Sequence, residues 1–433
     1  MASPKIARLL LIAPQTAVLC DSNNFSTTGC QTGKSTPRST PGVGGICVCS
    51  LDWYLMKVAL IHSFYRSAFP SGENLAVQLQ SSALLGAGHA VEIFGRHTDD
   101  FVGNPLYPIE SAFTVATGRG PNPLEDVRAF RPDLVHVHNL FPNWGTRWLR
   151  HLDVPLVSTI HNFRPICAAG TLLRDGVFCE LCPTQGSLNA VQNSCYRNSA
   201  LKTLPLAIAS RRSRIPTVFE HSDALIFLSE RTRRIYQGYG LGFEEKSHVV
   251  PNFVDAPLND DVRQRLGKEA HWVFAGRLSQ EKGILDLIKD WPVGTPLLVV
   301  GGGPDEQACL EAARGKQITF FGQRDHEFVN LVLRNAKGLV FPSTCFENSP
   351  MIYLEALSHG LPVVALRGNA VADDVTDAQT GVAVSSMAGF QEGVQQVEKR
   401  YGFFRSNAIS RFEYHFSKDV WLAKVEAVYR SLL

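Results

Sequence analysis

Residues 346 to 357 read Phe346-Glu347-Asn348-Ser349-Pro350-Met351-Ile352-Tyr353-Leu354-Glu355-Ala356-Leu357. Ser349 is a favourable N-cap and Pro350 suits the first position of a helix. The segment therefore predicts a loop that carries Glu347, followed by a helix that carries Glu355 on its second turn. Backbone N–H groups at the helix start, Met351 among them, and the positive end of the helix dipole favour an anion between the two acids. We expect a site for a phosphorylated ligand such as a sugar diphosphate.

A second segment places two cations after a predicted strand. It reads Val273-Phe274-Ala275-Gly276-Arg277-Leu278-Ser279-Gln280-Glu281-Lys282-Gly283. Departure of a nucleoside diphosphate builds negative charge on its phosphates, and cations fixed at a strand end stabilise that charge. Arg277 and Lys282 suit this task, although Glu281 could instead hold either cation in an ion pair. The pair of acids alone, Glu347 and Glu355, would favour a solvated helix face. The segment with Arg277 and Lys282 is the reason to prefer a phosphate site.

Glycines follow a third predicted strand, in Val299-Val300-Gly301-Gly302-Gly303-Pro304. A dinucleotide-binding turn needs a complete Gly-x-Gly-x-x-Gly that runs into a helix, and Pro304 interrupts that pattern here. Glycines without side chains still let a backbone approach a ligand closely. An ordinary strand-to-turn transition is the alternative interpretation.

The spacing of Glu347 and Glu355 resembles the E-x7-E signature of retaining GT-B glycosyltransferases of family 4, and the cation and glycine segments resemble segments of the same family. The resemblance implies that Glu347 lies beside the donor sugar and that Glu355 holds the ribose hydroxyls. It implies catalytic roles for His161, Glu347, Arg277 and Lys282. The residues that it places on the donor are Gly72, Asn252, Gly276, Arg277, Lys282, Gly302, Glu347, Ser349, Met351 and Glu355.

Two of the implied site residues come from the first half of the chain. Gly72 resembles a position in the family's glycine loop, and Glu73 after it is expected only to begin a helix. His161 ends a predicted strand, where parallel sheets bind ligands, and it aligns with the family's histidine beside the donor sugar. A lone histidine is otherwise more often packed in a core. His136 and His138 alternate on another strand and are expected to be structural.

Short β-branched runs alternate with helical stretches, which predicts buried parallel strands covered by helices. The predicted strands are Lys57–Ser63, Ala90–Gly95, Leu134–Asn139, Leu156–His161, Ala224–Ser229, Trp272–Ala275, Leu297–Val300, Ile318–Phe321, Gly338–Phe341 and Pro362–Ala365. They form two halves that part near Val249–Asp255, and each half reads as a doubly wound sheet. The expected fold is α/β, with two Rossmann-like domains facing across a cleft, as the GT-B resemblance implies.

The expected domain boundaries are 1–55 for a head, 56–250 for an acceptor-side domain and 251–433 for a nucleotide-sugar-binding domain. Ser22–Gly45 is rich in Ser, Thr, Gly and Pro. The head is therefore interpreted as disordered or as the product of a mis-assigned start, since a strand begins directly after Met56. The last helix, within Ser417–Leu433, is expected to cross back to the first domain, and packing on its own domain is the alternative.

Composition excludes some classes of function. The 433 residues are 45% hydrophobic with a net charge of +2, so there is no basic excess to neutralise nucleic-acid phosphates. Apolar runs fall short of the roughly 18 residues of a membrane-spanning helix, and Pro14 interrupts a signal-like run at Leu9–Cys20. The expected location is cytoplasmic. Peripheral contact with the inner face of the membrane stays open for the arginine-rich segments 211–214 and 231–234, which solvated helix faces explain equally well.

Four of the ten cysteines form a local set. They are Cys167, Cys179, Cys182 and Cys195. Cys179 and Cys182 have the C-x-x-C spacing of half a tetrahedral metal site. Reduced thiols that hold no metal are an equal alternative in a reducing compartment, and catalysis by a cysteine is not expected.

Together these segments predict a retaining hexosyltransferase that moves a sugar from a nucleotide-sugar donor to a hydroxyl of a sugar, lipid-linked or small-molecule acceptor. No Asp-x-Asp occurs in the chain. No divalent metal or other cofactor is therefore expected, and Arg277, Lys282 and the helix dipole would take the leaving-group charge. A catalytically silent relative that binds sugar nucleotides is one alternative. A nicotinamide-dependent oxidoreductase is the other, although the chain lacks the glycine fingerprint that it needs.

Overall fold

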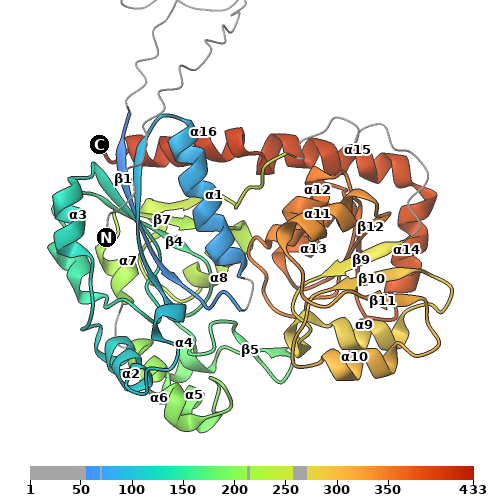
Figure 1. Ribbon diagram of the computed structural model, residues 1–433, viewed down its shortest axis with the longest axis horizontal. Helices are drawn as coiled ribbons and strands as arrows, with labels where there is room; N and C mark the ends of the chain where they lie inside the picture. Colours follow the sequence, from blue (N-terminus) through green and yellow to red (C-terminus); the bar gives the residue numbers. More distant parts are fainter. Residues whose placement is uncertain (1–54, 69–70, 212–214, 257–270) are drawn as a thin grey trace, which may run out of the picture. The chain divides into compact units, whose positions relative to one another are not determined.

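The computed structural model describes residues 55–68, 71–211, 215–256 and 271–433. Predictions about the head before residue 55 and about Arg212–Arg214 lie outside these ranges. Residues Tyr54–Leu433 form one compact unit. Two parallel sheets, each six-stranded, make up the core of this unit (Figure 1).

The first sheet has the order β2-β1-β3-β4-β7-β8, and all its pairs are parallel. Its strands are β1 (Lys57–Phe64), β2 (Ala90–His97), β3 (Leu134–Asn139), β4 (Leu156–Ile160), β7 (Ala224–Phe227) and β8 (Ser247–Val249). β3, β4 and β7 are buried along their whole length, as parallel strands covered on both faces must be. The five strands predicted for this half are confirmed, and β8 is an additional short edge strand.

The second sheet has the order β11-β10-β9-β12-β13-β14, again all parallel. Its strands are β9 (Trp272–Ala275), β10 (Leu297–Val300), β11 (Ile318–Phe320), β12 (Gly338–Phe341), β13 (Val363–Leu366) and β14 (Gly381–Val384). Chain order reverses between β9 and β12, and ligands of such sheets bind beyond the strand ends at that point. The prediction of two doubly wound sheets is confirmed, with β14 an addition.

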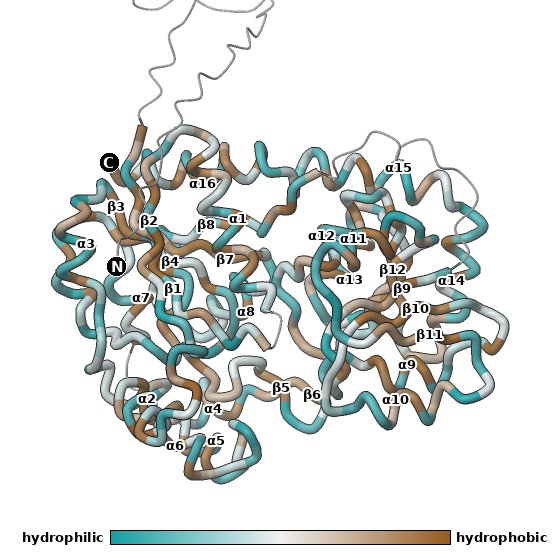
Figure 2. The backbone as a smooth tube through the Cα atoms, in the orientation of Figure 1, coloured by the Kyte–Doolittle hydropathy of each residue, from teal (hydrophilic) through white to brown (hydrophobic). Residues whose placement is uncertain are grey.

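Helices cover both sheets, and the tube in Figure 2 shows apolar segments concentrated on the strands. In the first half the helices are α1 (Gly72–Gly86), α2 (Tyr107–Thr117), α3 (Leu124–Phe130), α4 (Leu181–Gln185), α5 (Leu188–Gln192), α6 (Ala200–Ala209), α7 (Thr217–His221) and α8 (Glu230–Gln237), with a small hairpin of β5 (Leu173–Arg174) and β6 (Val177–Phe178). In the second half they are α9 (Ile284–Asp290), α10 (Glu306–Ala312), α11 (His326–Arg334), α12 (Met351–Ser358), α13 (Ala370–Asp377), α14 (Phe390–Lys399) and α15 (Tyr401–Arg411).

The last helix, α16 (Lys418–Arg430), follows α15 through a π-helical turn, Phe412–Phe416 (Figure 1). It packs on the first sheet, because Trp421 and Val425 share one apolar core with Val58 and Leu60 of β1. A polar contact adds to this packing, since Glu426 Oε1 accepts a hydrogen bond from His89 Nε2 at 3.0 Å. The chain therefore returns to the first half after it completes the second.

The start of α12 differs from its prediction by one residue. Pro350, with φ −71° and ψ 130°, is the N-cap, and the helix begins at Met351. The prediction of Ser349 as N-cap and Pro350 as first helical residue is therefore wrong. The reason is tertiary, because the Ser349 hydroxyl accepts a hydrogen bond from the Asn252 backbone N–H at 3.1 Å and so is not used by the helix.

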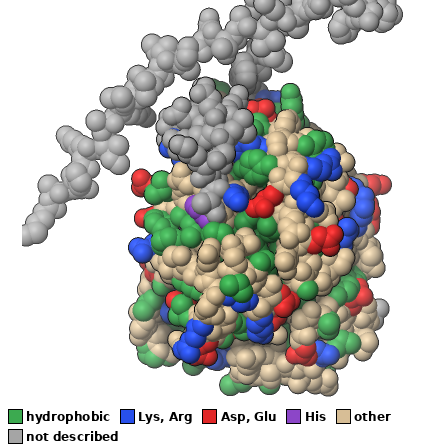
Figure 3. Space-filling view, turned by 90° about the vertical axis from the view of Figure 1, so that its right-hand side faces the viewer, with side chains coloured by type: hydrophobic (Ala, Val, Ile, Leu, Met, Phe, Trp, Pro, Cys, Tyr) green, Lys and Arg blue, Asp and Glu red, His purple; other side chains and the backbone are tan. Residues whose placement is uncertain are grey.

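Charged residues of both signs are interspersed on the described part of the face in Figure 3, in keeping with the small net charge. Within the described ranges, none of the helices combines the length and apolar content that crossing a bilayer requires.

Candidate active site

A cleft of about 1270 Å³ is lined by both halves of the chain. That volume exceeds the roughly 300–1,000 Å³ that is typical of a pocket for one small ligand. All the predicted site residues line it. They are Gly72, His161, Asn252, Gly276, Arg277, Lys282, Gly302, Glu347, Ser349, Met351 and Glu355. Their shared position is an observation, and their individual roles stay predictions.

The first turns of α1 and α12 meet across this cleft. A Cβ added to Gly72 would lie 3.3 Å from Cγ of Met351, so these two helix starts are in contact. Ser71 caps α1, since its hydroxyl accepts from the Asn74 backbone N–H at 3.4 Å. Each helix start presents backbone N–H groups and a positive dipole end. Two such ends at one place favour a ligand with more than one negative charge, as a diphosphate has.

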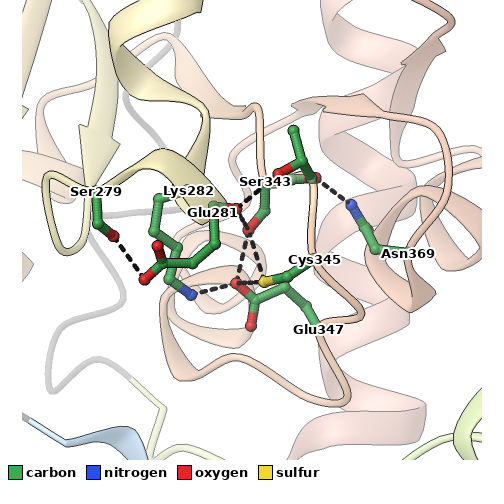
Figure 4. Close-up of polar contacts among 8 residues, drawn as sticks. Ser279, Glu281, Lys282, Ser343, Cys345, Glu347 and Asn369 are labelled. Atoms are coloured by element: carbon green, nitrogen blue, oxygen red, sulfur yellow. Dashed lines mark hydrogen bonds and ion pairs between the residues drawn. The ribbon is translucent and has the colours of Figure 1, made fainter. Parts of the chain in front are cut away.

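Lys282 and Glu347 form an ion pair in the cleft (Figure 4). Lys282 ends a short 3₁₀ helix, Gln280–Lys282, that follows β9, and Glu347 follows β12. They meet because β9 and β12 are neighbours at the point where strand order reverses. Burial alone would lower the pKa of Lys282, but the Glu347 carboxylate raises this pKa above its ordinary value. Burial likewise opposes ionisation of Glu347, and Lys282 holds the pKa of this acid below its ordinary value. Both groups are therefore charged at neutral pH.

Hydroxyl and thiol groups fix Glu347 further. Ser343 Oγ donates to Glu347 Oε1 at 2.8 Å, and Cys345 Sγ lies 3.7 Å from the same oxygen. The ion-pair partner of Lys282 is Glu347, while the Glu281 carboxylate accepts from the Ser279 hydroxyl at 2.7 Å and adds a smaller contribution to the raised pKa of Lys282. Glu281 instead supports the loop through its carbonyl oxygen, which accepts from the Thr344 backbone N–H at 3.0 Å. The alternative in which Glu281 neutralises Lys282 is thus replaced by pairing with Glu347.

Glu355 is buried on α12 and contacts a histidine that sequence analysis did not single out. Its Oε1 lies 2.9 Å from Nε2 of His326, the first residue of α11, and Glu355 is 5% exposed. The hydrogen bond to Glu355 raises the pKa of His326. A ligand group that approaches Glu355 in the cleft therefore meets this histidine as well. No local sequence pattern identifies His326, because its raised pKa and its contact come from the Glu355 carboxylate on another helix.

The glycine turn after β10 packs on the strand end that carries Arg277. A Cβ on Gly301 would lie 1.9 Å from the carbonyl oxygen of Gly276, and one on Gly303 would lie 2.2 Å from that of Leu278. These two positions therefore require glycine for packing. The nearest atom to a Cβ on Gly302 would lie 3.5 Å away, so packing does not require glycine at this position. Gly302 lines the cleft. Arg277 itself is exposed at the cleft mouth.

Two amides connect the halves of the chain at the cleft. Asn252 is buried, and its Nδ2 donates to the carbonyl oxygen of Ser349 at 2.9 Å. Asn348 Nδ2 donates to the carbonyl oxygen of His161 at 2.6 Å. These bonds tie the loop before α12 to the first sheet, and they place His161 directly beside the E-x7-E segment.

His161 follows β4 and lies in the cleft wall. Burial, together with the neighbouring imidazoles of His62 and His136, lowers the pKa of His161 to about 3. The ring is therefore neutral at physiological pH. It can act there as a hydrogen-bond donor or acceptor, but it carries no charge to offset a phosphate.

Glu73 also lines the cleft, which the expectation of a simple helix start missed. Burial raises its pKa to about 7, although Arg164 and a hydrogen bond with Asn162 act in the opposite direction. Its Oε1 is buried without a hydrogen-bond partner among the described residues. The only signal in the sequence was its position next to Gly72. An acid that is half protonated near neutral pH, on the wall of the first half, can hydrogen-bond a hydroxyl group.

The four cysteines of the local set are neighbours in space. The thiols of Cys167, Cys195 and Cys179 each contribute to the raised pKa of Cys182, after burial as the largest cause. All four are free thiols. Within the described ranges, however, no three His, Cys, Asp or Glu side chains are arranged to hold a metal ion. The choice between reduced thiols and a metal site, which the spacing left open, stays a prediction.

The arginine-rich segment on α8 is partly occupied by ion pairs. Arg231 Nη1 lies 2.7 Å from Asp373 Oδ2 of α13, and Arg233 pairs with Glu230 on its own helix. Arg231 therefore connects the two halves of the chain.

Two family models match the chain. One, described as "Glycosyltransferase Family 4", matches residues 72–257, and the other, described as "Glycosyl transferases group 1", matches residues 269–399. Glycogen synthase of Mycobacterium tuberculosis is 28% identical over 286 residues, which are 62% of this chain and 61% of the relative. The chain thus spans less than two thirds of the length of these curated relatives.

Solved structures share the fold. Sucrose-phosphate synthase from Thermosynechococcus elongatus has a TM-score of 0.62 at 19% identity, covering 87% of this chain and 99% of that chain. HepE of Anabaena in complex with UDP-glucose has a TM-score of 0.56 at 16% identity, covering 87% and 100%. At these identities the likeness shows the fold alone. Together with the two family models and the two facing doubly wound sheets, it shows that the chain belongs to the GT-B glycosyltransferases of family 4.

Proposed function

We propose that this glycosyltransferase moves a sugar from a nucleotide-sugar donor to an acceptor hydroxyl and retains the anomeric configuration. One observation carries the proposal: the starts of α1 and α12 meet at the same cleft that holds Lys282, Glu347 and Glu355. The solved HepE complexes contain UDP and UDP-glucose, which supports a nucleoside diphosphate sugar as the class of donor.

The donor would lie with its diphosphate beside the two helix starts, which contact each other at Gly72 and Met351. Glu355 would accept hydrogen bonds from the ribose hydroxyls, and it would exchange its contact with His326 for them. Lys282 pairs with Glu347 in the structure. The arriving diphosphate would compete with Glu347 for this cation, which frees the carboxylate of Glu347 for a hydroxyl of the donor sugar.

Lys282, Arg277 and the helix starts would stabilise the leaving diphosphate. Negative charge on the phosphates grows as the bond from sugar carbon to phosphate oxygen breaks, so fixed positive groups lower the barrier more than they strengthen binding. On this proposal the leaving group needs no divalent metal. Transfer in the presence of a chelator, compared with transfer in added Mg²⁺, tests that part.

The acceptor would bind on the wall of the first half, beside Glu73 and His161. We infer attack from the face that the leaving group occupies, with a departing phosphate oxygen accepting the proton of the acceptor hydroxyl. This route accounts for retention without a nucleophile from the protein. It also gives Glu347 and His161 the task of holding the sugar rather than bonding to it.

A panel of nucleotide sugars screened by thermal stabilisation of the full chain tests donor binding. A ligand present at about a hundred times its Kd stabilises the folded state by roughly 2.7 kcal/mol. We expect at least one donor to do so, and Glu355→Ala to reduce this stabilisation by about half or more at the same donor concentration. Acceptor-dependent release of nucleoside diphosphate then separates an enzyme from a silent binder. Stabilisation without any release would favour the silent relative, and no stabilisation at all would contradict the proposal.

A further inference from the structure

A group of buried histidines lies directly behind the cleft wall. His138 of β3 is 5% exposed, and its Nδ1 lies 3.1 Å from Nε2 of His161. His136 on the same strand uses both ring nitrogens elsewhere, at 2.7 Å from the Tyr429 hydroxyl and 2.8 Å from the Thr159 hydroxyl. His138 differs, because its Nε2 is buried and has no hydrogen-bond partner within the described ranges.

The two rings share a single proton at their contact. Burial keeps both imidazoles neutral, since the pKa of each is lowered well below its ordinary value. A neutral imidazole carries one proton, so one ring must donate and the other must accept. Either His138 donates from Nδ1, or His161 donates from Nε2.

The unpartnered nitrogen of His138 decides between these arrangements. If His161 donated, His138 would carry its proton on Nε2 and would bury an N–H group that has no acceptor. If His138 donates, its Nε2 is a bare lone pair. A buried N–H group without an acceptor is rarer in folded proteins than a buried acceptor without a donor, because the N–H group loses its hydrogen bond to water and gains none in return. His138 therefore donates from Nδ1, and His161 accepts at Nε2.

We propose that His138 is a positioning residue that holds His161 as the tautomer with its proton on Nδ1. His161 lines the cleft, so the ring nitrogen that His138 does not use is the one left for a ligand. The cleft wall thereby gains a ring N–H donor. Resting on the proposed function, this donor suits an oxygen of the donor sugar, and the β3 histidine that sequence analysis took as structural acquires a role in turnover.

The tautomer can be measured without any substrate. Ring ¹⁵N–¹H NMR of the full chain, labelled in histidine and assigned by loss of signals in His161→Gln, reports which nitrogen of His161 is protonated. We expect protonation at Nδ1 in the wild type. Protonation at Nε2 would overturn the proposal, whatever the protein's activity.

Substitutions at His138 test its effect on turnover. Asparagine places an N–H donor near the position of Nδ1, whereas leucine fills similar space without any donor. We expect His138→Asn to keep most of kcat, and His138→Leu to lower kcat about fivefold to tenfold with little change in KM for the donor, in line with loss of one hydrogen bond. Equal kcat in the folded Asn and Leu variants would overturn the proposal.

His136→Leu is the matched control, since it removes a buried histidine from the same strand. It should lower the melting temperature without changing the His161 tautomer or the turnover of the folded protein. A loss of kcat equal to that of His138→Leu would show a general packing effect and would overturn the assignment. Absence of sugar transfer in every assay would refute the proposed function, while the tautomer would still be decided by NMR.

Discussion

The Lys282–Glu347 ion pair gives a prediction whose size can be worked out from the structure. In a contact of about 3 Å, two unit charges attract by about 1.4 kcal/mol in water and about 5.5 kcal/mol at the effective dielectric constant of a protein surface site. The Lys282 side chain is 29% exposed and that of Glu347 is 13% exposed, so the pair lies between these limits. Desolvation of both charges offsets part of the attraction. We expect a coupling of about 2 kcal/mol.

A double-mutant cycle with Lys282→Met, Glu347→Gln and both changes together measures this coupling from urea unfolding at pH 7. Glu347→Gln should cost about 2–3 kcal/mol, because it leaves a partly buried ammonium group without its partner, and the double variant should be no less stable than this single one. The pKa of Glu347 is lower in the folded state than in the unfolded chain. The stability that the ion pair adds is therefore fully present above the unfolded pKa near 4.5, and it is lost as pH falls through the folded pKa. Additive single changes, within about 0.5 kcal/mol, would refute the pairing.

Three further predictions concern the other groups of the cleft. The pKa of Glu73 is raised from 4.5 to about 7, so the folded state keeps a proton that the unfolded chain releases, and stability falls as pH rises between these values. The free energy of unfolding of Glu73→Gln should not fall over this pH range, so at pH 7 the variant should be more stable than the wild type by up to about 3 kcal/mol. Parallel profiles of unfolding free energy against pH for the two proteins would contradict the raised pKa of Glu73. Glu355→Ala should weaken donor binding roughly tenfold or more in a titration, because a hydrogen bond to a charged group is lost, and unchanged affinity would exclude the ribose contact. Arg277→Lys should lower turnover more than donor affinity, since a point charge cannot reproduce a planar fork on two phosphate oxygens, and a native rate would remove Arg277 from the leaving-group site.

Much of the fold could be predicted because the strands are buried on both faces. A run such as Val363–Leu366 is apolar throughout, and its length and flanking turns distinguish it from a helix. The additional strands are less buried: none of the three residues of β8 is fully buried, and in β14 only Val384 is, so their sequences stand out less. The cap of α12 was misplaced because the Ser349 hydroxyl bonds to Asn252, a contact that local sequence cannot reveal.

Some residues of the site could likewise be identified from the sequence, and others could not. Residues in a fixed local spacing, such as Glu347 and Glu355, could be identified from the sequence, and the structure places them in one cleft. Glu73 and His326 could not, because their properties come from distant partners: Arg164 faces Glu73, and Glu355 contacts His326. The pairing of Lys282 with Glu347 likewise joins residues that are 65 positions apart. Local patterns thus marked positions at strand ends, whereas the contacts among side chains required the fold.

Retention of configuration is the central chemical claim, and the anomer of the first-formed product tests it most directly. The donor that stabilises the full chain in the thermal screen is incubated with an accepted acceptor, and ¹H NMR follows the anomeric proton before the product can equilibrate. We predict the same anomeric configuration in the product as in the donor sugar, with loss of the signal in Lys282→Ala. A product of the opposite configuration would contradict same-face attack, and with it the roles proposed for Glu347, His161 and the leaving diphosphate.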